Sequence, residues 1–186
     1  MSASAPWPTS SAWVVDPDKS KVLLVENNDI SVFAMCVSDD GKFLIFTSDM
    51  SGGFGGRDLW STTYDKKSDS WTTPVNLGSE INTPGNDMFA TFAKDGSLFY
   101  ATDGKPGMGG LDIFKAERVG EENKWQNPIN IGVPINSIHN DYALIEHTER
   151  KGYFTSERKS ENGENVPDIW AYILPPNVFD LKVIVS

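Results

Sequence analysis

The sequence predicts an all-β fold, and two features of its composition support this expectation. Phenylalanine, tyrosine and tryptophan make up 11% of the 186 residues, and aromatic side chains are common in strands. The 16 glycines and 11 prolines favour many short strands joined by tight turns over long helices. With 39% hydrophobic residues, the chain is long enough to form one domain with an ordinary hydrophobic core.

The charge balance limits the partners that the chain is expected to bind. Its 26 acidic and 16 basic side chains give a net charge of −10 at pH 7. No basic cluster is present that would attract a nucleic-acid backbone or an anionic membrane, so we expect no nucleic acid partner. The favoured interpretation is that the acidic surface keeps the protein soluble; the alternative is that it binds a cationic partner.

The cysteine count and the hydropathy exclude further classes. Cys36 is the only cysteine, which excludes an internal disulfide and a cysteine-based zinc site. Its apolar neighbours predict a small core residue. No stretch approaches the ~20 apolar residues of a membrane helix, and residues 1–12 lack the apolar core of a signal peptide. Direct membrane insertion is therefore not expected.

An internal repeat is the strongest signal in the sequence. The stretch SDDGKFLIFTSDMSGGFGGRDLW at 38–60 returns as AKDGSLFYATDGKPGMGGLDIF at 93–114, and more faintly at 148–170. The match continues further, because WTTPVNLGSEINTPGND at 71–87 is answered by WQNPINIGVPINSIHND at 125–141.

The repeat has a nearly constant period. Trp71 and Trp125 are 54 positions apart, as are Asp58 and Asp112, and Asp168 follows Asp112 by 56. Units of this length that each form a four-stranded antiparallel sheet are typical of the blades of a β-propeller. We therefore predict a β-propeller.

Each unit is expected to contain four strands. In the second unit they are predicted at 89–93, 97–102, 111–117 and 125–132, from their β-branched and aromatic residues. The last of these strands carries Pro128. Because proline has no backbone N–H to donate to a neighbouring strand, this strand is expected at the edge of its sheet.

Asp-Gly pairs are expected to form the hairpin turns between the first two strands of the first two units. They stand at Asp40-Gly41 and Asp95-Gly96, and Asp-Gly is a common tight hairpin turn. A further hairpin is predicted at 11–28, where two apolar runs flank DPDKS.

The repeat resembles a known family in the series DGKFLIFTSD, GGFGGRDLW and W..PVNLG..IN. It is similar to the TolB-like β-propeller repeats of bacterial cell-envelope proteins, above all to the propeller segments of OmpA-like proteins of Bacteroidetes, some of which belong to the type IX secretion system. The resemblance covers residues 38 to about 172, with two close copies and a degenerate third.

The resemblance implies a periplasmic or outer-membrane-associated module that binds proteins, is not an enzyme and needs no cofactor. In that family peptidoglycan is bound by flanking domains, so this activity is not transferred to the present chain.

The expected organisation is a single propeller module with short extensions. Three units do not close a ring, because the smallest propellers have about four blades. The hairpin at 11–28 is expected to supply outer strands of another blade or to complete the third unit; otherwise the chain is a fragment, or two copies form a homo-oligomer. The expected boundaries are 1–10 for a flexible N-terminal extension, 11–175 for the propeller with repeat cores near 38–92, 93–147 and 148–172, and 176–186 for a linker and the start of a following β domain.

Glycines cluster between the second and third predicted strands of the first two units. A phosphate cradle would need a helix after the glycines, whereas here a strand follows. The calcium pattern G-G-x-G-x-D fits poorly, because one residue is in excess and the period is not nine. The preferred interpretation is that the glycines permit positive φ in a tight connection. The glycines concerned are Gly52, Gly53, Gly55, Gly56, Gly107, Gly109 and Gly110.

Two sets of acids recur in all three units. Asp58, Asp112 and Asp168 open the third predicted strand, and each is expected to accept backbone N–H bonds from the loop before it. The acids that end the second predicted strand would line one face and meet a ligand or a partner loop; the simpler alternative, which is favoured, is that each caps a loop. This second set is Asp49, Asp103 and Glu157.

Catalysis receives little support from the sequence. His139 and His147 are the only histidines, and neither a Ser/His/Asp arrangement nor a carboxylate pair of a glycosidase can be argued. We expect no metal site. The sequence therefore predicts a non-enzymatic scaffold for protein contacts. The alternatives are a propeller glycoside hydrolase or lyase with carboxylates on the channel face, and a calcium or small-ligand module.

Overall fold

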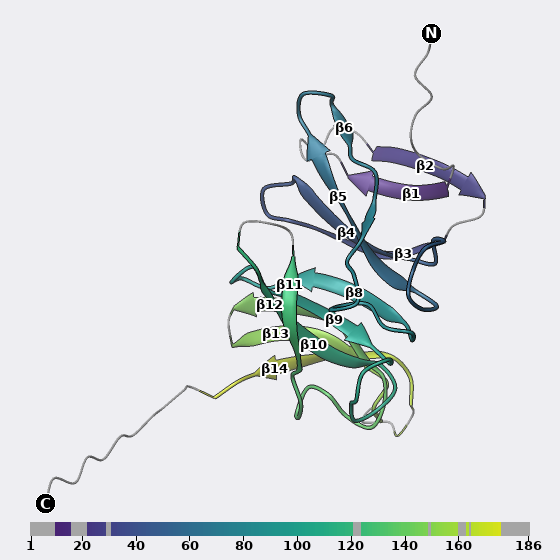
Figure 1. Ribbon diagram of the computed structural model, residues 1–186. Helices are drawn as coiled ribbons and strands as arrows, with labels where there is room; N and C mark the ends of the chain where they lie inside the picture. Colours follow the sequence, from purple (N-terminus) through teal and green to yellow (C-terminus); the bar gives the residue numbers. More distant parts are fainter. Residues whose placement is uncertain are drawn as a thin grey trace, which may run out of the picture.

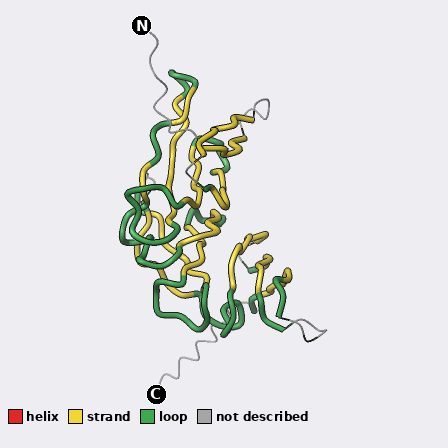
Figure 2. Tube along the Cα trace, turned by 90° about the vertical axis from the view of Figure 1, so that its right-hand side faces the viewer, coloured by secondary structure: helices red, strands yellow, loops and turns green. Residues whose placement is uncertain are grey.

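The computed structural model describes residues 31–120, 124–148, 150–159, 163 and 165–175, and the strand backbone of 10–15 and 22–28. These residues form strands, turns and loops without a helix (Figure 2). The predicted all-β class is therefore confirmed.

The first sheet is built from the first repeat unit. It contains β3 (Val32–Val37), β4 (Phe43–Ser48) and β5 (Asp58–Asp65) in chain order. Two short strands, β6 (Ser70–Trp71) and β7 (Val75–Asn76), both pair with the outer side of β5.

The second sheet has the four strands that the repeat predicts. They are β8 (Asp87–Phe92), β9 (Leu98–Thr102), β10 (Asp112–Arg118) and β11 (Trp125–Asn130), all antiparallel to their neighbours. The strand β11 lies at the edge, as its proline predicted.

The Asp-Gly pairs lie in the expected hairpin turns between the first and second strands. Gly41 and Gly96 have φ values of 70° and 83°, a region that glycine enters without steric penalty.

The third sheet contains only three described strands, which are β12 (Asp141–Thr148), β13 (Lys151–Ser156) and β14 (Asp168–Ile173). The hairpin predicted at 11–28 is present as β1 (Ser10–Val15) and β2 (Val22–Asn28). It forms a separate two-stranded sheet and is hydrogen-bonded to none of the other described strands. It therefore does not complete the third unit. The tail at 176–186 and the extension at 1–10, except Ser10, lie outside the described residues.

The three larger sheets pack in chain order, with the first strands of the units next to one another (Figure 1). The strand β8 contacts β3 on one side and β12 on the other. Among the described strands these sheets do not close into a ring.

Two hydrophobic clusters join successive sheets. The cluster between the first and second sheets includes Ile45 and Leu59 on one side and Tyr100 and Phe114 on the other. The cluster between the second and third sheets is shared by side chains of both sheets, which are Phe99, Ile113, Leu144, Phe154 and Tyr172. The second sheet thus buries one face against the first sheet and the other against the third.

The two repeated tryptophans belong to hydrophobic clusters: Trp125 to the cluster between the first and second sheets, and Trp71 to a third cluster with Leu44, Phe46 and Trp60. Trp71 and Trp125 are buried, and the ring centroid of Trp125 lies 5.6 Å from that of Phe43 in the first sheet. The edge strand β11 therefore packs against the first sheet through its first residue.

We expect Ile113→Ala to lower the free energy of unfolding by about 2–5 kcal/mol, because it opens a cavity between two sheets. Ile113 is 1% exposed, whereas Ile129 on the edge strand is 63% exposed, so Ile129→Ala should change stability by less than about 0.5 kcal/mol. Urea unfolding measures both values. Equal losses for the two variants would contradict the packing described.

Candidate functional site

The strand-end acids Asp49, Asp103 and Glu157 lie at equivalent places in the three sheets. Each follows the last residue of the second strand of its sheet. Asp49 and Asp103 are exposed, and Glu157 is half-buried. Because the second strand is antiparallel to the first, each acid lies beside the start of the first strand.

Each strand-end acid accepts a hydrogen bond from the residue that precedes the first strand of its own unit. The backbone N–H of Ser31 donates to Asp49 Oδ1 at 2.9 Å. The Asn140 side chain donates to Glu157 Oε2 at 2.7 Å.

Asp103 is held most firmly of the three strand-end acids. Asn86 donates to it through its backbone N–H at 2.6 Å and through its side-chain amide at 2.9 Å. The acids thus tie two strand ends together rather than capping the loop that follows each of them, and each carboxylate oxygen retains a lone pair for a further donor.

The glycine loops differ from the prediction that their glycines permit positive φ. Of the seven predicted loop glycines only Gly52 has a positive φ, of 93°. The others are needed because a side chain would collide with a neighbour. A Cβ on Gly53 or Gly107 would lie 2.3 Å or 1.8 Å from a carboxylate oxygen of the next aspartate.

Two further glycines of each loop admit the linker that leads to the next sheet, which is 77–86 after the first sheet and 131–140 after the second. A Cβ on Gly55 would lie 2.1 Å from the carbonyl oxygen of Gly85, and one on Gly109 would lie 2.1 Å from that of His139. Gly56 and Gly110 meet the side chains of Asn86 and Asn140 in the same way. The sequence could not reveal this reason, because the contact is made by a segment that follows the remaining strands of the same unit.

Asp58 and Asp112 perform the predicted structural role. The carboxylate of Asp58 accepts the backbone N–H groups of Phe54 and Gly55 and the side-chain amide of Asn76. Asp112 accepts the N–H groups of Met108 at 2.7 Å and Gly109 at 3.1 Å. Carboxylates that are occupied by donors in this way are poor ligands for calcium.

Asp168 departs from this arrangement. It is exposed, and its carboxylate accepts the N–H of the adjacent Ile169 at 2.8 Å. Among the described residues no N–H group of the preceding loop donates to it; Glu164, at the position equivalent to Phe54 and Met108, lies outside them.

Buried asparagines in the linkers were missed by the sequence reasoning. Asn82 bonds both backbone groups of Leu59, and Asn136 bonds both backbone groups of Ile113, at 2.8 to 2.9 Å. The recurrence of asparagine at the same place in both units was the available signal. These amides fix each linker to the third strand of the sheet before it.

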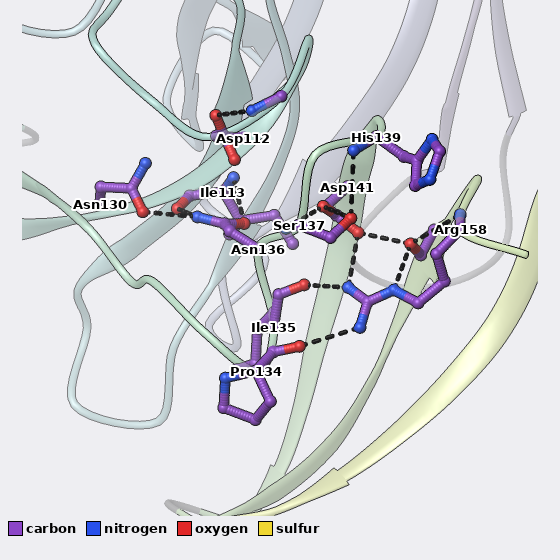
Figure 3. Close-up of polar contacts among 12 residues, drawn as sticks. Asp112, Ile113, Asn130, Pro134, Ile135, Asn136, Ser137, His139, Asp141 and Arg158 are labelled. Atoms are coloured by element: carbon purple, nitrogen blue, oxygen red, sulfur yellow. Dashed lines mark hydrogen bonds and ion pairs between the residues drawn. The ribbon is translucent and has the colours of Figure 1, made fainter.

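A second missed feature is the buried acid that opens the first strand of the second and third sheets. Asp87 and Asp141 are both 0% exposed. Asp141 pairs with Arg158, whose Nη2 lies 2.8 Å from its Oδ1 (Figure 3). The same guanidinium donates to the carbonyl oxygens of Pro134 and Ile135, so it joins the second linker to the third sheet.

Asp87 has no such arginine, because the position equivalent to Arg158 is Gly104. Its carboxylate accepts the backbone N–H of Thr83 at 2.6 Å and the Thr83 hydroxyl at 3.0 Å. Burial raises the pKa of Asp87, and the nearby carboxylate of Asp58 acts in the same direction. A buried acid with this environment favours its protonated form.

A groove of about 430 Å³ lies at the hairpin turns of the first two sheets. Its charged lining includes Asp40, Lys42, Lys94 and Arg118, and Lys42 lies 3.2 Å from Asp40. The hydrogen bond from the Ser38 hydroxyl lowers the pKa of Asp40 to about 2, so this carboxylate is ionised at neutral pH and is unsuited to act as a general acid.

Within the described ranges, no group of three or more histidine, cysteine, aspartate or glutamate side chains is arranged to hold a metal ion. No helix long and apolar enough to cross a membrane occurs in the same part of the chain.

We expect Asp112→Ala to reduce the free energy of unfolding by about 1–3 kcal/mol, because two loop N–H groups lose their acceptor. Asp168→Ala should have an effect below about 0.5 kcal/mol, since the side chain is exposed. Chemical denaturation of both variants tests this. A loss for Asp168→Ala as large as that for Asp112→Ala would refute the difference.

Asp87 should make stability depend on pH. The folded chain binds its proton more tightly than the unfolded chain, so its contribution is fully present below the unfolded pKa of about 4 and is lost as the pH rises through the folded pKa. The stability of Asp87→Asn relative to the unsubstituted chain should therefore rise with pH above about 4.

Asp40→Asn is the control for this measurement. Its folded pKa of about 2 lies below the unfolded value, so the relative stability of Asp40→Asn should fall slightly between about pH 2 and 4. Denaturant midpoints across the pH range measure both trends, and equal slopes for the Asp87 variant and the unsubstituted chain would disprove the first.

No protein-family model matches this chain, and no curated protein is significantly similar to it. The function is therefore argued from the geometry of the three sheets and from their repeat.

Proposed function

We propose that the three sheets are successive blades of a β-propeller and that this module is a non-enzymatic scaffold of the bacterial cell envelope. The scaffold binds a protein partner at the end of the sheets that carries the strand-end acids Asp49, Asp103 and Glu157. The repeat resemblance supports the envelope location, in the periplasm or at the outer membrane, and a place in type IX secretion machinery.

The propeller architecture is supported by how the strands are ordered. In each sheet the strands follow chain order from the first strand outwards, and the first strands β3, β8 and β12 are neighbours. Sheets that meet at their first strands and pack face to face are the arrangement of propeller blades around an axis. At least one further blade would be needed to close the ring.

The observation that carries the binding role is the fixed position of the three acids. Hydrogen bonds from Ser31, Asn86 and Asn140 hold the three carboxylates at the strand ends. Because these side chains are already ordered, a partner would not bear the full entropic cost of ordering them.

The partner is expected to present basic side chains. Three acids at one end of a chain with a net charge of −10 attract a basic surface and accelerate its encounter. Binding of this kind weakens as the salt concentration rises.

The test is affinity capture from bacterial envelope extract, followed by measurement of the salt-dependent affinity of the captured protein. The variant Asp49→Asn, Asp103→Asn and Glu157→Gln keeps the side-chain shapes and removes three charges. We expect it to bind at least about tenfold more weakly, equivalent to about 1.4 kcal/mol.

The matched control removes three exposed acids elsewhere, by Asp39→Asn, Glu80→Gln and Glu117→Gln, which are exposed. It should retain most of the affinity. An equal loss in both variants would reduce the effect to net charge, and no loss in either would reject the strand-end acids as the binding surface.

A further inference from the structure

An exposed apolar side chain stands in each of the first two glycine loops. Phe54 and Met108 both lie four residues before the aspartate that opens the third strand, and they are 50% and 44% exposed. The backbone N–H of each donates to the carboxylate of that aspartate, which is buried. The loop backbone is therefore held in place, and the apolar side chain is fixed in contact with water.

The linker that follows each unit brings a second apolar residue beside the first. A Cβ on Gly55 would lie 2.8 Å from the carbonyl carbon of Pro84, and one on Gly109 would lie 2.8 Å from that of Ile138. Pro84 is exposed, and Ile138 is 75% exposed. The pair Phe54 and Pro84 is called the first tip, and the pair Met108 and Ile138 is called the second tip.

The repetition of these tips distinguishes them from ordinary surface residues. A single exposed apolar side chain is common on proteins and needs no explanation. Here apolar residues stand at both positions in both units, 54 positions apart, on loops whose backbone is fixed by hydrogen bonds. An apolar surface of this kind is stabilised when a partner removes it from water.

Each tip lies beside one of the strand-end acids of the next sheet. A Cβ on Gly85, in the first linker, would lie 2.2 Å from Asp103 Oδ1. At the second tip, the Asn140 side chain donates to Glu157 Oε2 at 2.7 Å, and Asn140 follows the tip residue of its linker by two positions. The donors to both acids are uncharged asparagine groups, so these contacts do not neutralise the carboxylates.

The basic side chains that follow these two acids in the sequence bind other acceptors. Lys105 donates to the carbonyl oxygen of Glu80 at 3.3 Å, and Arg158 pairs with the buried Asp141. Each tip is therefore an apolar surface with a negative charge beside it, and its complement is an apolar group with a positive charge beside it.

We propose that each tip and the acid beside it bind an apolar and a basic side chain that are neighbours in a partner protein. This inference rests on the proposed function and states what the partner presents besides its basic groups. The apolar side chain packs on Phe54 or Met108 and leaves water, while the basic one lies against Asp103 or Glu157. An anionic membrane does not fit the site, because both acids repel its head groups.

The first test uses fluorescent peptides that differ only in the first or second residue of a repeated triplet. The triplets are Leu-Lys-Ser, Ser-Lys-Ser and Leu-Glu-Ser, and fluorescence anisotropy with the full chain measures their affinities. We expect the Leu-Lys-Ser peptide to bind at least about tenfold more tightly than each of the others, because only this peptide supplies both groups.

The variant Phe54→Ser with Met108→Ser removes the apolar side chains from exposed loop positions. It should bind the Leu-Lys-Ser peptide at least about tenfold more weakly and leave the affinity for the Ser-Lys-Ser peptide unchanged. The matched control is Val75→Ser with Ile129→Ser, because these side chains are 64% and 63% exposed at equivalent places on β7 and β11. The control should retain the affinity, and urea midpoints show that both variants are folded.

The variant Asp103→Asn with Glu157→Gln separates this inference from the proposed function. It should weaken the binding of both lysine peptides at least about threefold. If it does so while the tip variant binds like the unsubstituted chain, the inference is overturned and the acidic binding surface stands. If only the tip variant loses affinity, the acids are no part of the site, and both proposals fail.

Two further results would overturn the inference. One is equal affinity for the three peptides. The other is cosedimentation of the chain with phosphatidylcholine vesicles that Phe54→Ser with Met108→Ser abolishes, because this would assign the tips to a membrane surface instead of a protein.

Discussion

The close passage of each linker over the preceding glycine loop is the constraint on which the arrangement of the sheets depends. The Cα atoms of Gly55 and Gly109 face linker carbonyl groups with no room for a Cβ. Once the linker lies there, Asn82 and Asn136 reach the backbone of the third strand. The next sheet is thereby placed against the last, and its apolar side chains are buried there.

The same constraint explains why polar and apolar residues repeat together. Asp58 and Asp112 hold the glycine loop by accepting its N–H groups, and the linker passes close to the glycines of the same loop. Without the carboxylate the loop would lose its shape, and without the glycines the linker could not approach. The repeated residues therefore support one another, and the unit is specified as a whole.

The regular parts of the fold could be predicted from the sequence, whereas the contacts between units could not. Strand order, hairpin turns and the edge position of β11 follow from local patterns such as Asp95-Gly96 and Pro128. The role of Gly109 depends on His139, which follows only after two further strands, and local patterns do not record it. The ion pair of Asp141 with Arg158 has no counterpart at Asp87. An argument from the equivalence of the units therefore does not predict this ion pair.

The third unit shows which features of the repeat belong to the unit and which belong to its neighbour. Where the two glycines are replaced by Asn165 and Val166, Asp168 is exposed and accepts the N–H of the adjacent Ile169. The apolar residues Tyr153 and Ile169 remain, although both are exposed. The glycines are needed only where a linker passes close to the loop, whereas apolar side chains are stabilised by any contact that excludes water from them. The third unit thus keeps the apolar positions of a sheet interface without the glycines that admit a linker.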